Sequence, residues 1–371
     1  MSAWGIRRVS AALAVLVAVG LALVAVPVEH GTLDSAAPVA TVTAPPAPAP
    51  PAPVPLSAAE IVDRVSPTIV MLTSISGVTA TAGTGIVIRP DGSDALVLTN
   101  HHVIDGGTDI TATSIPDRAT YPVVVLGYDS SRDLALLRLP GGARLPAAPI
   151  APGPARIGDP VTAVGNADGG GIPAAAPGAV TRVGVTITTR NTADGSRNQL
   201  SDLVQVDANV RPGDSGGPLV DVFGQVVGVN SAGNAVEPGV DAAPAPTSYA
   251  IPIDAALGLV DEVLSGRAAP TTHIGPTPML GISVRDRRST TIGDAAGAEV
   301  IHVGYRSPAE EVGLVRGDVI TGFAGAAIRT SEDLTIGMNA RHPGDRVDVQ
   351  WTDATGAPRS AAVVLQEGPP R

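Results

Sequence analysis

The segment Gly-Asp-Ser-Gly-Gly-Pro at positions 213–218 places a serine among glycines, between two apolar stretches. A turn that joins two strands explains the composition, because glycine and proline are the residues that most often interrupt regular structure. A nucleophile explains it too, since glycine tolerates strained backbone angles and leaves room for a substrate beside the Ser215 hydroxyl. The segment alone leaves both interpretations open, and the rest of the chain must decide between them.

A serine hydroxyl becomes an effective nucleophile when a base takes its proton and a carboxylate orients that base. Of the six histidines, only His101 and His102 follow a strand-like run directly, in "VLTNHHVID". Asp133 precedes the apolar run "LALLRL", where a simple turn aspartate is the alternative explanation. The chain order His102, Asp133, Ser215, with separations of 31 and 82 residues, is the order found in two-barrel serine proteases.

The elements that must position these residues are mostly strands. From about Leu56 to Gly266, short β-branched runs alternate with Gly, Asp, Asn and Pro, which predicts an all-β barrel or sandwich. Helices are expected over residues 57–66 and 253–266. Residues 276–367 mix strands with two short helices, one opened by a capping box at Ser307–Glu310 and one capped by Thr330. A hairpin across residues 353–358 is expected to close this region.

Several blocks of the chain resemble a known family. "TNHHVI", "DLALLRL" and "DANVRPGDSGGPLVD" resemble the three catalytic blocks of HtrA/DegP-type trypsin-like serine proteases, and "MLGISV" and "SPAEEVGLVRGDVITGFAG" resemble their C-terminal PDZ domain. The segments "HIGPT" and "EGPP" are similar to those of mycobacterial secreted or membrane-anchored HtrA-like proteases. The resemblance covers nearly all of the chain from residue 57 onward. It implies a mostly β protein, with a chymotrypsin-like double β-barrel followed by a PDZ domain.

The resemblance also implies catalytic roles. Ser215 would be the nucleophile, His102 the general base and Asp133 the carboxylate that orients it. The family pattern is Thr-Asn-any-His-Val, so His101 occupies the variable position. The main-chain N–H groups of Gly213 and Ser215 would form the oxyanion hole.

Further residues are expected to bind the substrate. Asn230, Ser231 and Ala232 resemble the strand that pairs with the substrate backbone. Asn209, six residues before Ser215, falls near the floor of the pocket for the residue before the cut. This pocket would be uncharged, so we expect a preference for small or medium apolar residues.

In the PDZ-like region, an extended C-terminal peptide would add to a sheet edge while its carboxylate meets backbone N–H groups. Met279, Leu280, Gly281 and Ile282 have the form expected of that carboxylate-binding segment. An ordinary strand that begins at a glycine is the alternative explanation.

Two features depart from the family pattern. Asp214 stands where many HtrA-type proteases have asparagine, and we expect it to hydrogen-bond within its own turn. Family members form trimers through aromatic residues near the start of the protease domain, but this chain has no aromatic residue between Trp4 and Tyr121. The homo-trimer is therefore left open.

The amino-acid composition argues against several other kinds of partner and site. The 371-residue chain carries a net charge of −11, which argues against nucleic acid as a partner because that interaction needs a basic patch. It has no cysteine, which excludes disulfides, cysteine nucleophiles and thiolate metal sites. No metal site and no cofactor are expected.

The beginning of the sequence predicts export. Arg7 and Arg8 precede Ala11–Val28, which are 18 residues without a charged or polar side chain. This pattern indicates a signal peptide or a membrane anchor within residues 1–30, with the anchor favoured and the remainder outside the cytoplasm. An Ala/Pro-rich disordered linker is expected at 31–56, a protease domain at 57–266 and a PDZ domain at 276–368.

Together these features predict an exported, ATP-independent serine endopeptidase of the cell envelope that acts on unfolded or misfolded proteins. Its PDZ domain would bind peptide C-termini. The alternatives are a chaperone with a protease fold, or a PDZ-based scaffold protein with little proteolysis.

Overall fold

The computed structural model describes residues 54–190, 197–234, 246–287 and 296–371. The expected signal or anchor segment and the linker up to residue 53 lie outside the described residues. Within the described ranges, no helix is both long and apolar enough to cross a membrane.

The first half of the protease region forms an eight-stranded antiparallel sheet in the order β14-β6-β7-β3-β2-β1-β4-β5. Alternate residues of its central strand β3 face two different clusters: Leu96 and Leu98 belong to one, whereas Ala95 and Val97 belong to the other. The period-two alternation of a strand therefore lets β3 be buried on both faces. The strands are β1 Ile69–Ser76, β2 Thr79–Asp91, β3 Asp94–Thr99, β4 Asp109–Ser114, β5 Thr120–Pro122, β6 Val124–Asp129, β7 Leu134–Leu139 and β14 Thr272–Ile274.

The second half forms a closed barrel in the order β10-β13-β12-β11-β8-β9. Its interior is filled by small and β-branched residues such as Val161, Ala163 and Val206. The strands are β8 Pro160–Gly165, β9 Ala174–Arg190, β10 Arg197–Val206, β11 Pro218–Asp221, β12 Val226–Asn234 and β13 Thr247–Pro252.

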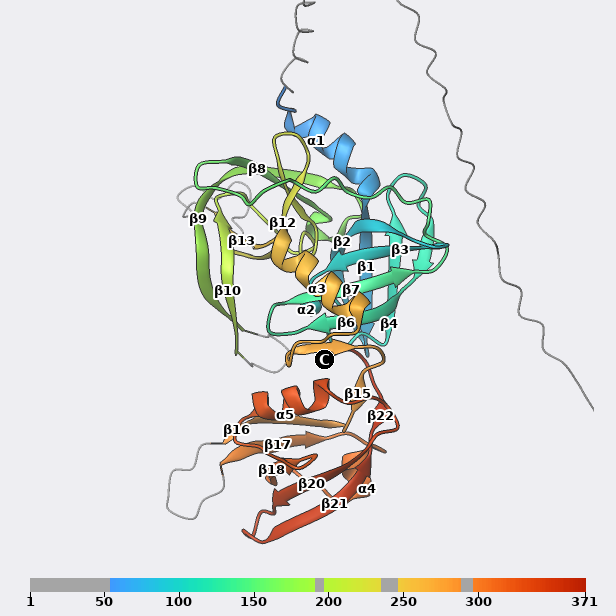
Figure 1. Ribbon diagram of the computed structural model, residues 1–371, viewed down its shortest axis with the longest axis vertical. Helices are drawn as coiled ribbons and strands as arrows, with labels where there is room; N and C mark the ends of the chain where they lie inside the picture. The colour runs from blue at the N-terminus through green and yellow to red at the C-terminus, as the bar shows by residue number, and fades with distance from the viewer. Residues whose placement is uncertain (1–53, 191–196, 235–245, 288–295) are drawn as a thin grey trace, which may run out of the picture. The chain divides into compact units, whose positions relative to one another are not determined.

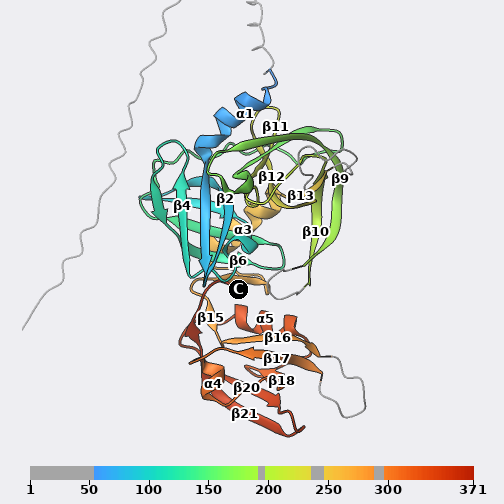
Figure 2. The ribbon, with the colours of Figure 1, turned by 180° about the vertical axis from the view of Figure 1, so that it is seen from behind.

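Helix α3 (Ile253–Ser265) packs between the sheet and the barrel. It contacts β6 and β7 of the sheet as well as β12 and β13 of the barrel (Figures 1 and 2). Its residues Ala256, Leu259, Val260 and Val263 recur at helical spacing and are all buried. The helix ends at Gly266, which takes a φ of +68°. The sequence expectation of a helix here is confirmed.

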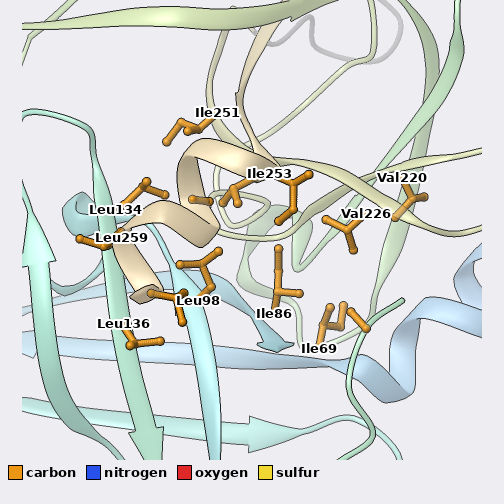
Figure 3. Close-up of a cluster of buried hydrophobic side chains, with 14 of the residues drawn as sticks. Ile69, Ile86, Leu98, Leu134, Leu136, Val220, Val226, Ile251, Ile253 and Leu259 are labelled. Atoms are coloured by element: carbon orange, nitrogen blue, oxygen red, sulfur yellow. The ribbon is translucent and has the colours of Figure 1, made fainter. Parts of the chain in front are cut away.

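The cluster around α3 joins the two halves into one core (Figure 3). Figure 3 labels residues from the sheet, the barrel and α3: Leu98, Leu134 and Leu136 from the sheet, Val220 and Val226 from the barrel, and Ile253 and Leu259 from α3. The catalytic candidates lie on segments that leave this shared core, so the core sets their separation.

The other short helices of this region are α1 Ala58–Val65, α2 His101–Ile104 and the 3₁₀ turns Ser66–Thr68 and Ala167–Gly169. Helix α1 begins as expected at Ser57, whose backbone N–H donates to the Glu60 carboxylate at 2.8 Å. The Ser57 hydroxyl in turn accepts from the Glu60 backbone N–H.

The C-terminal region forms a six-stranded sheet with two helices, and β15 and β22 pair as a small sheet of their own. Its strand order is β16-β17-β18-β20-β21, and β19 pairs with β18. Phe323 and Trp351 lie in its core. The elements are β15 Pro278–Met279, β16 Ile282–Arg287, β17 Gly297–Val303, α4 Pro308–Glu311, β18 Val319–Phe323, β19 Ala326–Ala327, α5 Ser331–Asn339, β20 Arg346–Thr352, β21 Pro358–Val364 and β22 Gln366–Glu367.

The expected helix starts are found, with one correction. Thr330 caps α5 in a full capping box with Asp333. Ser307 accepts from the Glu310 backbone N–H at 3.2 Å, but the Glu310 carboxylate accepts from Arg306 instead of Ser307, at 2.6 Å. Only half of the predicted capping box therefore forms, because the glutamate reaches one residue further back.

The mostly β architecture expected from the sequence is confirmed, with two details that the pattern did not give. Among the described strands, only those of the second half close into a barrel by pairing, since β14 and β5 remain the two edges of the first sheet. Strand β14 lies between the expected protease and PDZ domains, and it pairs with β6 of the first sheet.

Candidate active site

His102 lies on α2, the single turn of helix that follows β3. Its backbone N–H donates to Asp133 Oδ1 at 3.0 Å, and its ring Nδ1 lies 2.9 Å from Asp133 Oδ2. The backbone and the ring of His102 therefore meet one carboxylate. The side chain is 46% exposed.

Asp133 ends the short loop between β6 and β7. It takes a φ of +55°, a left-handed conformation that aspartate tolerates better than most residues. Ser231 on β12 donates its hydroxyl to Asp133 Oδ2 at 2.6 Å, and Asn100 donates its side-chain amide to the Asp133 carbonyl oxygen at 2.9 Å. The carboxylate is thus held by groups from β12 and α2, and its backbone by the end of β3.

These contacts shift both pKa values. Desolvation, the largest single effect, would lower the pKa of His102, but the charge and hydrogen bond of the Asp133 carboxylate together with the charge of Asp105 raise it by more, so the pKa lies above its ordinary 6.5. Burial alone would raise the pKa of Asp133, but His102 and Ser231 lower it by more. The pair is therefore built to carry a positive imidazolium beside a negative carboxylate.

His101 has a different environment. Its side chain is buried, and its ring lies 4.8 Å from the Tyr128 ring, measured between centroids. Burial, the largest effect, lowers its pKa. Of the two adjacent histidines, it is therefore His102 that meets Asp133.

Ser215 lies on the turn before β11, with Gly213 and Gly216 on either side in left-handed conformations, at φ of +97° and +80°. A side chain at Gly213 would collide with the Asn166 carbonyl oxygen, so the position accepts only glycine. The Ser215 hydroxyl donates to the Ser231 carbonyl oxygen at 3.2 Å. No hydrogen bond between Ser215 and His102 is formed within the described residues.

Ser231 therefore connects the three catalytic candidates. Its carbonyl accepts from Ser215, and its hydroxyl donates to the carboxylate that holds His102. A bulge in the pairing of β12 with β13 falls at this residue, between Asn230 and Ala232. The structure thus brings Ser231 to the centre of the site, where the sequence analysis gave it only a substrate-binding role.

The peptide groups before Ser215 are held in fixed directions. The Asp168 N–H donates to the Pro212 carbonyl oxygen at 2.7 Å, so the trans peptide turns the Gly213 N–H to the opposite side. The Gly213 carbonyl oxygen accepts from the Thr84 hydroxyl at 2.8 Å. Among the described residues, the N–H groups of Gly213 and Ser215 donate to no protein acceptor, so both remain available for an oxyanion.

Asp214 hydrogen-bonds within its own turn, since its Oδ2 accepts from the Arg211 N–H at 2.9 Å. The side chain is buried, and burial, the largest effect, raises its pKa to about 6. Its Oδ1 is buried and has no hydrogen-bond partner among the described residues.

Asn209 and Asn230 lie in different surroundings. Asn209 lines a 310 Å³ cavity with Arg211, Asp214, Ala167 and residues 174–177, and Ser215 is not part of that lining. Asn230 is 1% exposed, and both of its backbone groups are bonded to Gly216 and Gly217 at 2.8 Å. Asn230 therefore supports the nucleophile turn from behind. Ala232 lies beyond the bulge and pairs with Tyr249.

Two site residues were not identified from the sequence. Thr84 lies within the "GTGIVI" strand and Asn100 lies in "TNHHVI", and both are fully buried polar residues. The only available signal was a polar residue within an apolar strand or at its end, which is too common to assign a role.

The carboxylate-binding candidates of the C-terminal region form one continuous segment. Met279 ends β15, and Leu280 is buried. Gly281 takes a φ of +81°, and any side chain there would collide with Ser307. Ile282 begins β16, which is an edge strand of its sheet and faces α5. In the parts of the chain that the structure describes, no group of three or more His, Asp or Glu side chains is arranged to hold a metal ion.

Comparison with known proteins matches two regions of the chain to families. Residues 83–229 match the trypsin-like peptidase domain, and residues 278–353 match the PDZ domain. The chain is 32% identical to "Serine protease PepD" of Mycobacterium tuberculosis over 352 residues, covering 89% of this chain and 70% of that protein.

A second relative agrees with this assignment. The chain is 30% identical to "Probable periplasmic serine endoprotease DegP-like" of Chlamydia trachomatis, covering 72% of this chain and 50% of that protein. A solved structure described as "HtrA-type protease AlgW with tripeptide" is 25% identical, covers 85% of this chain and 98% of its own, and superposes with a TM-score of 0.46. The resemblance expected from the sequence is confirmed: this chain belongs to the HtrA/DegP-type family of trypsin-like serine endopeptidases that carry a C-terminal PDZ domain.

Proposed function

We propose that this protein hydrolyses peptide bonds of unfolded or misfolded proteins through an acyl-enzyme formed on Ser215. The observation that carries the proposal is the chain of contacts from His102 through Asp133 and Ser231 to Ser215. It links a nucleophile, a base and an orienting carboxylate from separate parts of the chain. Such an arrangement supports acyl transfer.

In this mechanism the Ser215 hydroxyl turns from the Ser231 carbonyl toward His102, which accepts the proton as Ser215 attacks the scissile carbonyl. Asp133 stabilises the imidazolium that results, in keeping with the raised pKa of His102. The N–H groups of Gly213 and Ser215 stabilise the oxyanion. His102 then gives the proton to the leaving amine, and a water molecule releases the acyl group by the same steps in reverse.

The rotation of Ser215 also releases the Ser231 carbonyl oxygen. A substrate laid along β12 beyond the bulge can then donate a backbone N–H to that oxygen. We therefore keep Ser231 and Ala232 as substrate-binding residues. Asn230 acts in the proposal as a support for the turn, because its backbone groups already bond to Gly216 and Gly217.

We further propose that the PDZ domain binds the C-terminal end of a peptide. Strand β16 is an edge strand, so its free side can pair with an added strand while α5 forms the other wall. The left-handed Gly281 just before β16 allows a carboxylate to approach the backbone closely.

The proposed place of action is outside the cytoplasm. The support is the apolar run Ala11–Val28 behind two arginines, together with the DegP-like relative that is described as periplasmic. An anchored form is our preferred version, and the oligomeric state is left to experiment.

The test compares the parent chain with Ser215→Ala, using a fluorophosphonate label and fluorescein-labelled casein, which is unfolded without any denaturant. We expect the parent to take one label and to cleave casein, and we expect the variant to do neither. If the folded parent neither labels nor cleaves, even with added peptides ending in apolar residues, the proteolytic proposal is wrong. The chaperone and scaffold alternatives then take its place.

A further inference from the structure

The loop that carries Asp133 is held by an ion-pair network that the mechanism above does not use. The loop runs from Asp129, the last residue of β6, to Leu134, the first residue of β7, and these two residues pair with each other. Four residues of hairpin loop therefore determine where the Asp133 carboxylate lies.

The Asp129 side chain holds the loop together from within by accepting hydrogen bonds from two loop residues. Its side chain is fully buried, and Oδ1 accepts from the Ser131 N–H at 2.9 Å, the Ser131 hydroxyl at 2.6 Å and the Arg132 N–H at 3.0 Å. Oδ2 accepts from Arg132 Nε at 2.7 Å and from the Thr271 hydroxyl at 2.6 Å. Its pKa is lowered, since these bonds together outweigh the effect of burial.

Arg132 connects the loop to two other elements, α3 and β14. Its two terminal nitrogens bind the two carboxylate oxygens of Glu262 on α3, at 3.1 and 2.6 Å. One of them also donates to the Thr272 hydroxyl on β14 at 2.9 Å. This is the two-pronged arginine–carboxylate geometry that fixes direction as well as distance, which a lysine cannot reproduce.

The network matters because Asp133 follows Arg132 directly. At Asp133 the backbone is in the left-handed region, which costs free energy and persists only where neighbouring contacts enforce it. Asn100 holds the residue on one side through its carbonyl oxygen. The residue before it, Arg132, is anchored to a helix and a strand that lie 130 and 140 residues further along the chain.

We propose that Arg132 is a positioning residue for catalysis, which holds the Asp133 carboxylate against His102 by clamping the β6–β7 loop to α3 and β14. The proposal rests on the function proposed above for Asp133 and His102. Arg132 touches neither the substrate nor His102. Its effect passes through the backbone of the residue that follows it.

The test measures fluorophosphonate labelling of Ser215 in the full chain as a function of pH and of label concentration. The variants are Arg132→Gln, Arg132→Lys and Glu262→Gln. Arg138→Gln is the matched control, because Arg138 is a similarly exposed arginine on β7 that pairs with Asp94 at 3.7 Å. Circular dichroism confirms that each variant is folded at the assay temperature.

We expect Arg132→Gln to lower the limiting labelling rate about ten- to a hundredfold, while the half-saturating label concentration changes less than about twofold. Displacement of Asp133 also removes what raises the His102 pKa, so the acid limb of the rate profile moves to lower pH. Arg132→Lys is expected to fall between Arg132→Gln and the parent, Glu262→Gln to lower the limiting rate less than Arg132→Gln, and Arg138→Gln to match the parent.

The direction in which the acid limb moves distinguishes two explanations, namely displacement of Asp133 and loss of the Arg132 charge alone. Loss of a positive charge alone would raise the His102 pKa and move the acid limb to higher pH, so that result overturns the proposal. An unchanged rate and profile in folded Arg132→Gln overturns it as well. If Arg132→Gln does not fold, Arg132→Lys takes its place as the test variant, because it lacks the two-pronged contact but keeps the charge. Its labelling rate and pH profile are then compared with those of the parent. A folded parent that takes no label at Ser215 overturns the proposed function itself.

Discussion

Replacing Thr84 with valine tests how the turn before Ser215 is held. Thr84 is fully buried on β2, and its hydroxyl donates to the Gly213 carbonyl oxygen at 2.8 Å and accepts from the Asn166 N–H at 3.0 Å. Valine has nearly the same shape, so the substitution removes the hydroxyl and leaves the packing in place. The backbone bond from the Thr84 N–H to the Ser215 carbonyl oxygen is also retained.

The size of the destabilisation follows from the Gly213 carbonyl and the Asn166 N–H, which both lose their hydrogen-bond partner in Thr84→Val. A buried carbonyl or N–H that loses its hydrogen bond costs about 1–3 kcal/mol, so we expect a loss of about 4 kcal/mol in the free energy of unfolding. For a domain of this size, such a loss lowers Tm by about 10 °C. Thermal unfolding followed by circular dichroism measures it.

The same substitution should impair catalysis. Asn166 begins the loop whose Asp168 N–H holds the Pro212 carbonyl, and that bond sets the direction of the Gly213 N–H. Freeing both the turn and the loop allows the Gly213 N–H to leave the oxyanion hole, and the loss of one such donor lowers kcat about a hundredfold. The assay is casein cleavage measured well below Tm.

Thr84→Ser is the matched control, because it keeps the hydroxyl and loses only a methyl group. We expect it to retain most of the parent activity. If folded Thr84→Val has the kcat of the parent, the turn does not depend on this hydroxyl. If only Tm falls, Thr84 stabilises the fold without positioning the oxyanion donors.

Two further predictions concern the base and the PDZ segment. Asp133→Asn should lower kcat about ten-thousandfold, and it should move the acid limb of the pH–rate profile downward. Neutral His102 is the active form, so the parent rate rises as pH passes through a pKa above 6.5. The stability that protonated His102 contributes is present below pH 6.5 and is lost as pH rises through the folded-state pKa, and an acid limb unchanged by Asp133→Asn would contradict this assignment. Gly281→Ala should weaken binding of a fluorescent peptide with a free apolar C-terminus, measured by anisotropy, because Gly281 has a φ of +81° and lies against Ser307. Gly313→Ala is its control, with a similar φ of +82° but open space around it, and equal weakening in both variants would mean that backbone strain alone is responsible.

The sequence alone was enough to identify the strand-rich class, the limits of α1 and α3, the start of α5, and the three catalytic candidates. The reason is that these signals are local. A capping residue such as Thr330, a helical spacing of apolar residues or a glycine-flanked serine can each be recognised within a few positions. The choice of His102 over His101 came from a family pattern, and the structure adds that only the second ring faces Asp133.

The contacts that hold the site could not be predicted in this way, because they join residues far apart in the chain. The Ser231 hydroxyl meets Asp133 across 98 residues, Thr84 meets Gly213 across 129, and Arg132 meets Glu262 across 130. Each pairing depends on strand register, on the bulge in β12 and on how α3 packs between the sheet and the barrel. The sequence by itself determined which residues could perform the chemistry. Only the tertiary structure decided which other residues hold them in place, because strand pairing and core packing set those distances and the local order of residues does not.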